Sequence, residues 1–479
     1  MKLPRPDRRI YRGEIIFLDK DNHLAKLNEL YGQNCFQSVS LYCDAGMGKT
    51  TLLRQFSAGR RTLYFKPLET TDAENFLALK KEAIRILGPL EKLKAAKRFA
   101  ELFRTIGKAA REQPLLFIID DYPHMINKNR RLSTLVQSYM SKEWKTSRLF
   151  LILCKPASLY EKEAAQTANP LLLKPFTFFE TRQLFRHLPV EQQICIFGIT
   201  GGVPGYLSYF VNETPFRENL YQLFFTDKGE FYRRPTKFLK VHLSEPELAH
   251  SALLCLGAKR RKLHEICERT ELTPSAAGSL MNTLDLLGLV DKIIPVTEDA
   301  GSRRTLYRIS DGVFRFWYTF AAPNRSAIEL GCGREIFEKE VLPSLDRYSK
   351  ETFEDICRQY LNLLARRGDA PFSYDHAGSW WGQHPTRKRT EYVPIAAADD
   401  HNILLGDCFW TDEWIDLEGL QGLQKHASLF PHSTIWYYLF AKSDFVSGME
   451  TIYGDTVKVF TLEQMCTCGD AAICIPDIC

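Results

Sequence analysis

Short apolar runs alternate with amphipathic stretches of helical length between residues 38 and 173. The runs are continuously apolar rather than alternating, which is typical of strands buried on both faces. Amphipathic stretches between them predict crossover helices, so the strands should be parallel. We therefore expect a layered α/β domain over residues 1–175. Its strand candidates are residues 38–42, 62–65, 115–119, 149–153 and 171–173.

The pattern changes after residue 175. Residues 176–243 are predicted to form a helical lid, punctuated by the turn cluster at 201–205. Residues 244–320 predict a winged-helix domain, because helices at 263–269 and 274–287 precede strand-like runs at 290–296 and 305–309. Residues 321–479 predict a third, α/β-type domain. Its candidates are a helix at 338–366 broken at Pro343, strands at 392–396, 403–408 and 435–440, and a helix at 420–427.

Composition fits a soluble globular protein. The chain has 479 residues, of which 45% are hydrophobic and 25% charged, and this length predicts roughly three domains. The net charge of +5 is too small over this length to indicate a nucleic-acid binder by charge alone. We find neither a signal-peptide core nor an apolar stretch of membrane-spanning length, so we expect a cytoplasmic protein without membrane contact.

The strongest motif is Cys43-Asp44-Ala45-Gly46-Met47-Gly48-Lys49-Thr50, which lies between a predicted strand and a predicted helix. This is the context of a phosphate-binding loop, or P-loop. The glycines let backbone N–H groups surround phosphate oxygens, Lys49 reaches the β- and γ-phosphates, and the Thr50 hydroxyl ligates Mg²⁺. Cys43 replaces the usual first glycine, which affects the entry turn. The residues expected to bind ATP are Asp44, Ala45, Gly46, Met47, Gly48, Lys49, Thr50 and Thr51.

A second element of the same site is expected on a neighbouring strand. The run at 115–119 is followed by Asp120 and Asp121. Asp120 is predicted to support Mg²⁺ together with Thr50. Asp121 stands where a hydrolytic enzyme of this class has Glu to orient the attacking water. Its shorter side chain predicts slow hydrolysis, with Lys49 and Asp121 as the catalytic candidates.

Further short motifs follow in a fixed order along the chain. Besides the two ATP-site motifs, they are residues 17–20, 151–154, 174–176, 201–207, 307–311, 314–318, 380–382, 406–410 and 442–445. In this order the chain resembles prokaryotic (archaeal-type) AAA+ P-loop ATPases. In that family a winged helix and a C-terminal restriction-endonuclease-like domain of the PD-(D/E)XK type follow the ATPase domain. Lys155-Pro156 departs from the family's Gly-Ser after the fourth strand.

The resemblance also implies where nuclease residues would lie. The helix acid corresponds to Glu354 and the last motif pair to Asp407 and Phe409, where the family has an acid and Lys. The strand Asp falls on Val393, beside Glu391. Losing a metal ligand and a charge-stabilising Lys predicts an inactive, degenerate nuclease-like domain.

Cations flank the predicted winged helix at 259–262 and 303–304, as phosphate contacts would. Its recognition helix at 274–287 has no Arg or Lys, which argues against base-specific readout. The module is thus either a nonspecific DNA contact or a structural lid over the nucleotide site. Ring assembly is common in the wider ATPase class, so a homo-oligomer or a protein partner is a further expectation.

The sequence therefore predicts an ATP-binding, Mg²⁺-dependent AAA-type switch protein with slow hydrolysis. Two alternatives stay open. One is a DNA-associated adaptor in which ATP is structural, and the other is an ATP-gated DNA nuclease. A minor alternative for the tail is a metal site, which lacks the paired Cys-x-x-Cys spacing of zinc sites. Its candidate ligands are Cys466, Cys468, Cys474 and Cys479.

Overall fold

The structure is a computed structural model that describes residues 21–126, 129–210, 214–257, 259–299, 301–384, 389–431, 434–446, 448 and 454–473. The chain divides into two compact units, described separately here. The first comprises Met1–Pro175 and Val203–Ser208, and the second comprises Phe176–Gly202 and Tyr209–Cys479. Residues 203–208 were assigned to the helical lid by the sequence, but they pack with the first unit. The remaining division into a lid, a winged helix and a C-terminal domain stays a prediction.

The first unit contains a parallel five-stranded sheet in the order β2-β3-β4-β1-β5. All five strands expected from the apolar runs are present. They are β1 (Gln37–Tyr42), β2 (Thr62–Phe65), β3 (Leu115–Ile119), β4 (Leu149–Lys155) and β5 (Pro170–Leu172). One expectation is wrong, because β4 lies between β1 and β3, so the strand that ends at Asp120 is not the neighbour of β1.

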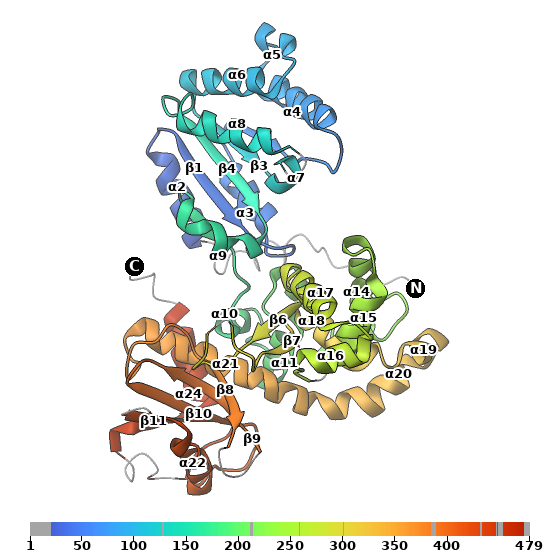
Figure 1. The fold of residues 1–479 in the computed structure, drawn as a ribbon, viewed down its shortest axis with the longest axis vertical. Coiled ribbons are helices and arrows are strands. Elements are labelled where there is room, and N and C mark those ends of the chain that lie inside the picture. Colours follow the sequence, from blue (N-terminus) through green and yellow to red (C-terminus); the bar gives the residue numbers. More distant parts are fainter. Residues whose placement is uncertain are drawn as a thin grey trace. The chain divides into compact units, whose positions relative to one another are not determined.

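Two hydrophobic cores cover the two faces of this sheet, as continuous apolar strands require. Leu115, Phe117 and Ile119 of β3 face one core, and Leu116 and Ile118 face the other. Helices α4, α6 and α8 cover the first face, while α2 and α3 cover the second (Figure 1). The helices of this unit are α2 (Asp21–Gly32), α3 (Lys49–Ser57), α4 (Asp72–Leu87), α5 (Glu91–Ala95), α6 (Phe99–Glu112), α7 (Tyr122–Ile126), α8 (Arg130–Ser141), α9 (Tyr160–Glu163) and α12 (Pro204–Leu207).

The second unit begins with helices and a two-stranded antiparallel ribbon. The ribbon pairs β6 (Val290–Ile293) with β7 (Leu306–Ile309) directly after α16 and α17, which is the order predicted for a winged helix. The helices are α10 (Phe178–Gln183), α11 (Val190–Thr200), α13 (Phe216–Phe224), α14 (Glu230–His242), α15 (Pro246–Leu256), α16 (Leu263–Thr270), α17 (Pro274–Leu286), α18 (Gly312–Phe316), α19 (Arg325–Ala327) and α20 (Gly333–Ile336).

A long helix, α21 (Leu345–Arg367), leads into a second five-stranded sheet. A 3₁₀ turn at Leu342–Ser344 precedes it, at the break predicted for Pro343. The order is β12-β11-β10-β9-β8, with β8, β9 and β10 antiparallel and β10, β11 and β12 parallel. The strands are β8 (Gly378–Gln383), β9 (Thr390–Ala398), β10 (Asn402–Phe409), β11 (Thr434–Ala441) and β12 (Val457–Thr461).

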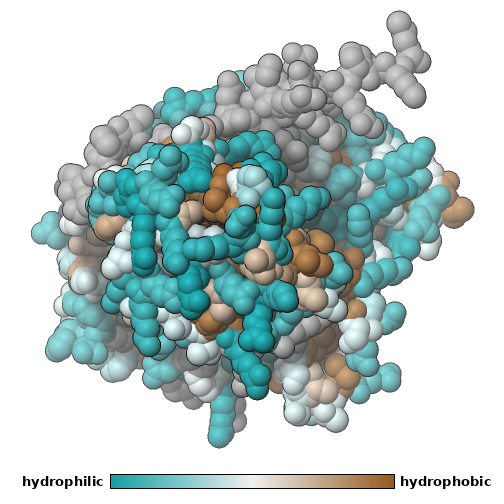
Figure 2. All heavy atoms as spheres, turned by 90° about the horizontal axis from the view of Figure 1, so that it is seen from above, coloured by the Kyte–Doolittle hydropathy of each residue, from teal (hydrophilic) through white to brown (hydrophobic). Residues whose placement is uncertain are grey.

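Helices pack on both faces of this sheet as well. Side chains of α21 and α24 (Leu462–Ile473) share one core with it, and those of α22 (Leu417–Gln424) share the other. The α/β character predicted for this region is therefore present, while the nuclease-like assignment stays a prediction. Hydrophilic residues cover most of the face drawn in Figure 2, with hydrophobic ones interspersed among them.

Candidate functional site

The loop between β1 and α3 has the backbone of an anion-binding turn. Gly46 and Gly48 have φ angles of 87° and 77°, in the left-handed region that glycine adopts without steric cost. Gly48 is also the N-cap of α3, and the first turn of this nine-residue helix carries no acidic side chain. A phosphate at this end would meet free helical N–H groups and the positive end of the helix dipole.

The residues predicted to bind ATP are accessible along most of this loop. Asp44, Ala45, Gly46 and Thr50 are exposed, and Gly48, Lys49 and Thr51 are partly buried. Met47 is the exception, since its side chain packs into the core under the loop.

Cys43 does not occupy a position that requires glycine. Its N–H donates to the carbonyl of Lys155 at 2.9 Å, which extends the β1–β4 ladder by one residue. Its φ angle is not positive. The departure from the usual motif is therefore compatible with a regular loop.

Lys49 meets both acids that follow β3. Its Nζ lies 2.5 Å from Oδ1 of Asp120 and 3.0 Å from Oδ1 of Asp121. Asp120 is only 2% exposed, and its Oδ1 has this ion pair but no hydrogen bond of good geometry. Burial alone would lower the pKa of Lys49, but the carboxylate of Asp120 raises it above the ordinary value. Lys49 is thus held as a cation at the mouth of the loop.

The backbone conformation at position 121 favours Asp over Glu. Its φ of 56° lies in the left-handed region, which Asp tolerates better than Glu. Its Oδ2 pairs with Lys66, which follows β2, at 3.0 Å. Burial would raise the pKa of Asp121, but Lys49 and Lys66 together hold it below the ordinary value. A carboxylate so paired is a weak base.

Two residues of this site were missed by sequence reasoning. The Tyr64 hydroxyl donates to Oδ2 of Asp120 at 2.6 Å, and burial together with this carboxylate raises the pKa of the phenol. Lys66 holds Asp121, as described above. Both come from the carboxyl end of β2, and the N–H of Asp120 donates to the Phe65 carbonyl at 2.8 Å. Only the strand order, which a single sequence does not contain, brings them to β3.

The segment Val203–Ser208 packs directly on the P-loop. The N–H of Gly205 donates to the Gly46 carbonyl at 2.9 Å, and a Cβ on Gly205 would lie 3.0 Å from the Cα of Gly46. Glycine at position 205 therefore permits the close approach. The chain on either side of this segment belongs to the second unit.

The donor set at this site fits Mg²⁺. A hard divalent cation takes oxygen ligands, and the Thr50 hydroxyl and the Asp120 carboxylate are both of this kind. Oδ1 of Asp120 is buried and lacks a well-formed hydrogen bond, so it is suited to face a cation. Lys155, at the end of β4, does not face the P-loop with a free charge, because it pairs with Glu163 at 2.6 Å.

Three of the six cations predicted to contact DNA form ion pairs with acidic side chains of the second unit. Arg260 pairs with Glu354 at 3.3 Å, Arg261 pairs with Glu265 at 2.7 Å, and Arg304 pairs with Glu298. The other three, Lys259, Lys262 and Arg303, are exposed. The cationic surface of this region is thus smaller than the sequence suggested.

The acids aligned with nuclease residues are largely engaged elsewhere. Besides Arg260, Glu354 meets the Tyr392 hydroxyl at 3.2 Å, and Glu391 pairs with Arg389 at 2.6 Å. Among the described residues, no group of three or more His, Cys, Asp or Glu could hold a metal ion. In the tail, Cys466 is buried and Cys468 accepts a hydrogen bond from Arg367, while Cys474 and Cys479 lie outside the described residues.

Comparison with known proteins supports the assignment of the first unit. Residues 17–210 match a family described as "ATPase domain predominantly from Archaea". This part of the chain is similar to an archaeal ATPase domain. Residues 317–421 match a second family, of archaeal and bacterial proteins of unknown function.

Relatives are similar over most of the chain. An uncharacterized protein of Methanocaldococcus jannaschii is 25% identical over 415 residues, which are 83% of this chain and 88% of that protein. A Walker-type ATPase of Pyrococcus abyssi is 16% identical with a TM-score of 0.47, covering 63% of this chain and 96% of its own. The Orc1 protein of Aeropyrum pernix, solved in complex with DNA, is 12% identical with a TM-score of 0.37, covering 68% and 97%. In the described part of the chain we find no helix with the length and apolarity needed to span a bilayer.

Proposed function

We propose that this protein is an ATP-binding, Mg²⁺-dependent AAA-type switch that hydrolyses ATP slowly. The observation that carries the proposal is the position of Lys49, on a glycine-shaped loop and within 3.0 Å of both Asp120 and Asp121. In this proposal Lys49 and residues 44–51 hold the phosphates. Thr50 and Asp120 hold Mg²⁺, which when bound neutralises charge that develops on the phosphates.

Slow hydrolysis follows from the state of Asp121. A group that orients or deprotonates water acts best when its pKa is near the working pH. Two lysines instead lower the pKa of Asp121, and its side chain is one methylene shorter than that of Glu. The site thus supports binding better than turnover.

The switch role is supported by the segment Val203–Ser208. Gly205 hydrogen-bonds the P-loop at Gly46, and the chain leaves this segment for the second unit in both directions. In the second unit, the N–H of Phe176 donates to the Gly202 carbonyl at 2.9 Å. This hydrogen bond joins the residue at which the chain enters the second unit to the residue at which it leaves for Val203. We propose that a change in loop conformation on nucleotide binding is passed along these connections.

The proposal is tested by measuring ATP affinity with and without Mg²⁺ and phosphate release under the same conditions. We expect saturable binding that Mg²⁺ strengthens, with turnover far below one per second. ATP that fails to bind would overturn the proposal. Brisk turnover would overturn its slow-hydrolysis part and show that Asp121 suffices.

A DNA-associated adaptor is the second candidate. The exposed cations Lys259, Lys262 and Arg303 lie around the predicted winged helix and favour it. Contacts to phosphates release counterions, so affinity should fall steeply with salt. Gel retardation at several salt concentrations tests this, and a complex whose affinity does not depend on salt would argue against it. The nuclease alternative has no comparable support, since Glu354 and Glu391 are paired with arginines.

A further inference from the structure

The second unit contains a cavity of about 270 Å³ that the ATP site does not use. It lies among α11, β7, α18 and α21, and the side chains that matter for its chemistry are Arg308, Arg315, Thr352, Asp355, Arg358 and Gln359. Its two stretches 307–311 and 314–318 were noted as sequence motifs, and each supplies one arginine.

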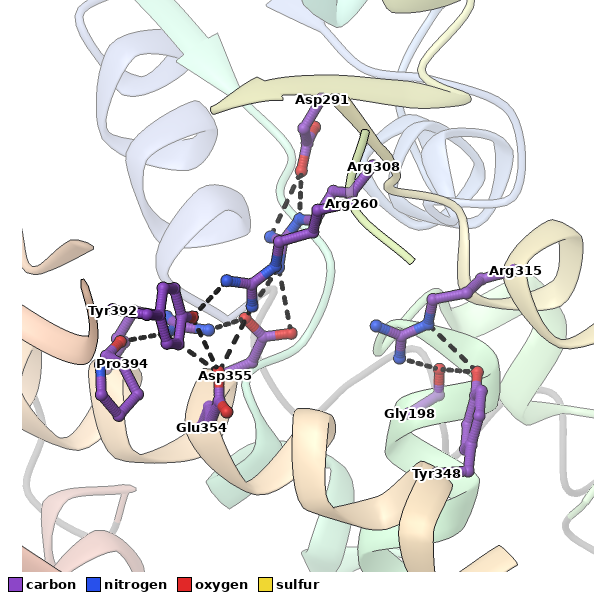
Figure 3. A network of polar contacts seen from close by, with 11 residues as sticks. Gly198, Arg260, Asp291, Arg308, Arg315, Tyr348, Glu354, Asp355, Tyr392 and Pro394 are labelled. Atoms are coloured by element: carbon purple, nitrogen blue, oxygen red, sulfur yellow. Dashed lines mark hydrogen bonds and ion pairs between the residues drawn. The ribbon is translucent and has the colours of Figure 1, made fainter. Parts of the chain in front are cut away.

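Two of the three arginines share one carboxylate. Arg308 lies 3.0 Å and Arg358 lies 2.6 Å from Oδ1 of Asp355 (Figure 3). Burial alone would raise the pKa of Asp355, but these guanidinium groups hold it well below its usual range. Arg308 also reaches Asp291 of β6, at 3.3 Å. The Asp355 carboxylate is therefore held in its ionised form, and both of its oxygens already accept hydrogen bonds from guanidinium groups.

The third arginine has only neutral partners. The Nε of Arg315 donates to the Tyr348 hydroxyl at 3.2 Å, and its Nη2 donates to the Gly198 carbonyl at 3.1 Å. Of the described carboxylates, none lies within ion-pair distance of Arg315. Figure 3 shows its guanidinium extending toward the side on which Asp355 lies. Asp291 and Asp355 pair with Arg308, and Asp355 and Glu354 lie within 4 Å of Arg358, so Arg315 is the arginine of this wall whose charge has no carboxylate beside it among the described residues.

Uncharged donors lie beside these arginines on the wall. The Thr352 side chain is 1% exposed, and its hydroxyl has no hydrogen-bond partner among the described residues. Gln359 and Asn362 accept hydrogen bonds at their side-chain oxygens from the N–H groups of Phe178 and Ala377. Their NH₂ groups, which only donate, are not used by these bonds. The wall therefore offers uncharged groups that can donate hydrogen bonds to an anion.

We propose that this cavity binds the phosphate group of a small phosphorylated molecule, or inorganic phosphate itself. An oxyanion would give Arg315 the charged partner that it lacks and accept hydrogen bonds from planar guanidinium groups, which match its geometry. The volume of 270 Å³ exceeds what phosphate alone needs and lies just below the usual range of organic ligand pockets. The site is separate from the P-loop and does not depend on the proposed ATPase function.

The competing explanation is that this cluster of arginines and acids has a purely structural role. Arg308 links β6 and α21, so the cluster also holds these elements together. If the role is purely structural, substitutions in the cluster lower the stability of the protein by the same amount with and without phosphate. Binding of phosphate, in contrast, must raise the stability of the folded protein as ligand concentration increases, with the logarithm of that concentration once it exceeds Kd.

The experiment uses the full chain carrying Lys49→Ala, which disables the P-loop as a phosphate site. Thermal unfolding and calorimetric titration are measured with inorganic phosphate, and separately with glycerol 3-phosphate, at constant ionic strength set with chloride. We expect saturable binding of at least one of these probes. The probe that binds more tightly shows whether the ligand of the cavity is free phosphate or a phosphate monoester.

Two variants in this background assign the binding to the cavity. Arg315→Gln should weaken phosphate binding at least tenfold, and Thr352→Val, which keeps the shape, should weaken it several-fold. Arg325→Gln removes an exposed arginine of α19 that pairs with Glu329, and it should leave binding unchanged. The proposal is overturned if neither probe binds saturably, or if the two cavity variants bind as tightly as the background. If the Arg315→Gln variant does not fold, phosphate binding by the Thr352→Val variant alone decides whether the cavity is the binding site.

Discussion

The Nζ of Lys49 lies 2.5 Å from Oδ1 of Asp120, although the strands that precede these residues are separated by β4. The long lysine side chain spans this gap at the carboxyl edge of the sheet. Because Asp120 is nearly inaccessible to water, the pair is held in a medium where charges interact strongly. In the proposed function Lys49 exchanges this partner for phosphate when nucleotide binds, so the acids and the ligand would compete for one cation.

Asp121→Glu should raise ATP turnover. The added methylene moves the carboxylate by about 1.5 Å, and misplacement of this size costs on the order of 100-fold in rate. We expect phosphate release to rise about tenfold. Stability should fall by roughly 1 kcal/mol, because Glu fits the left-handed backbone at φ 56° less well than Asp. Asp121→Asn is the control, which should bind ATP and release less phosphate. Equal rates for all three proteins would show that position 121 does not act on water.

Tyr64→Phe should weaken both the fold and the Mg²⁺ response. The substitution leaves Oδ2 of the buried Asp120 without its donor, which costs about 1–3 kcal/mol. We expect urea unfolding at a lower midpoint and a several-fold increase in the Mg²⁺ concentration needed for half-maximal ATP binding. Tyr139→Phe is a matched control, since the Tyr139 hydroxyl donates to the Ala100 carbonyl at 2.6 Å, within the core formed with α6 and α8. An unchanged Mg²⁺ response in Tyr64→Phe would contradict the role given to Asp120.

Gly205→Ala should lower ATP affinity several-fold through an indirect effect on the P-loop, without a contact between residue 205 and the nucleotide. The new Cβ would lie 3.0 Å from the Cα of Gly46 and 3.1 Å from its carbonyl oxygen, so the P-loop has to shift. Gly32→Ala is the control, because a Cβ at that position meets nothing within 4 Å. Fluorescent-ATP titration of both variants measures the effect. Equal affinity in the two variants would remove the support for coupling through Val203–Ser208.

Asp407→Asn should stabilise the protein at neutral pH. Burial raises the pKa of Asp407 above its ordinary value, so ionisation is penalised in the folded state. This penalty is present at neutral pH and disappears as pH falls through the folded and then the unfolded pKa, about 3.9 for the latter. Urea midpoints should therefore favour Asp407→Asn at pH 7 and converge with the wild type below about pH 4. A variant less stable at pH 7 would mean that the carboxylate has a favourable partner.

Local patterns were enough to predict the first sheet and the P-loop. Its strands are continuous apolar runs, and β3 is buried along its whole length. The spacing of Gly46, Gly48, Lys49 and Thr50 predicted a glycine-shaped loop between a strand and a helix, and the structure has this loop between β1 and α3, with Gly46 and Gly48 at positive φ. In the C-terminal sheet, β8 and β12 were not predicted, because glycines bound the two tryptophans of β8 and a lysine interrupts the short β12.

Other features depend on tertiary structure and leave no local trace. Tyr64 and Lys66 join the site only because β2 pairs with β3. Arg260 is part of a basic run that looks the same whether it faces a phosphate or Glu354, and the fold decides in favour of Glu354. The cavity around Arg315 likewise brings together residues more than 100 positions apart in the sequence, such as Gly198 and Arg315.

The most direct test of the central claim is a fluorescent-ATP titration of the wild type, Lys49→Ala and Lys66→Ala, each with and without Mg²⁺. Lys66 is an exposed lysine that also pairs with Asp121, so it controls for the loss of a charge near the site. We predict tight, Mg²⁺-dependent binding by the wild type and Lys66→Ala. Lys49→Ala should bind at least 100-fold more weakly, with an unchanged circular dichroism spectrum. Unchanged affinity in Lys49→Ala would contradict the assignment of the nucleotide site.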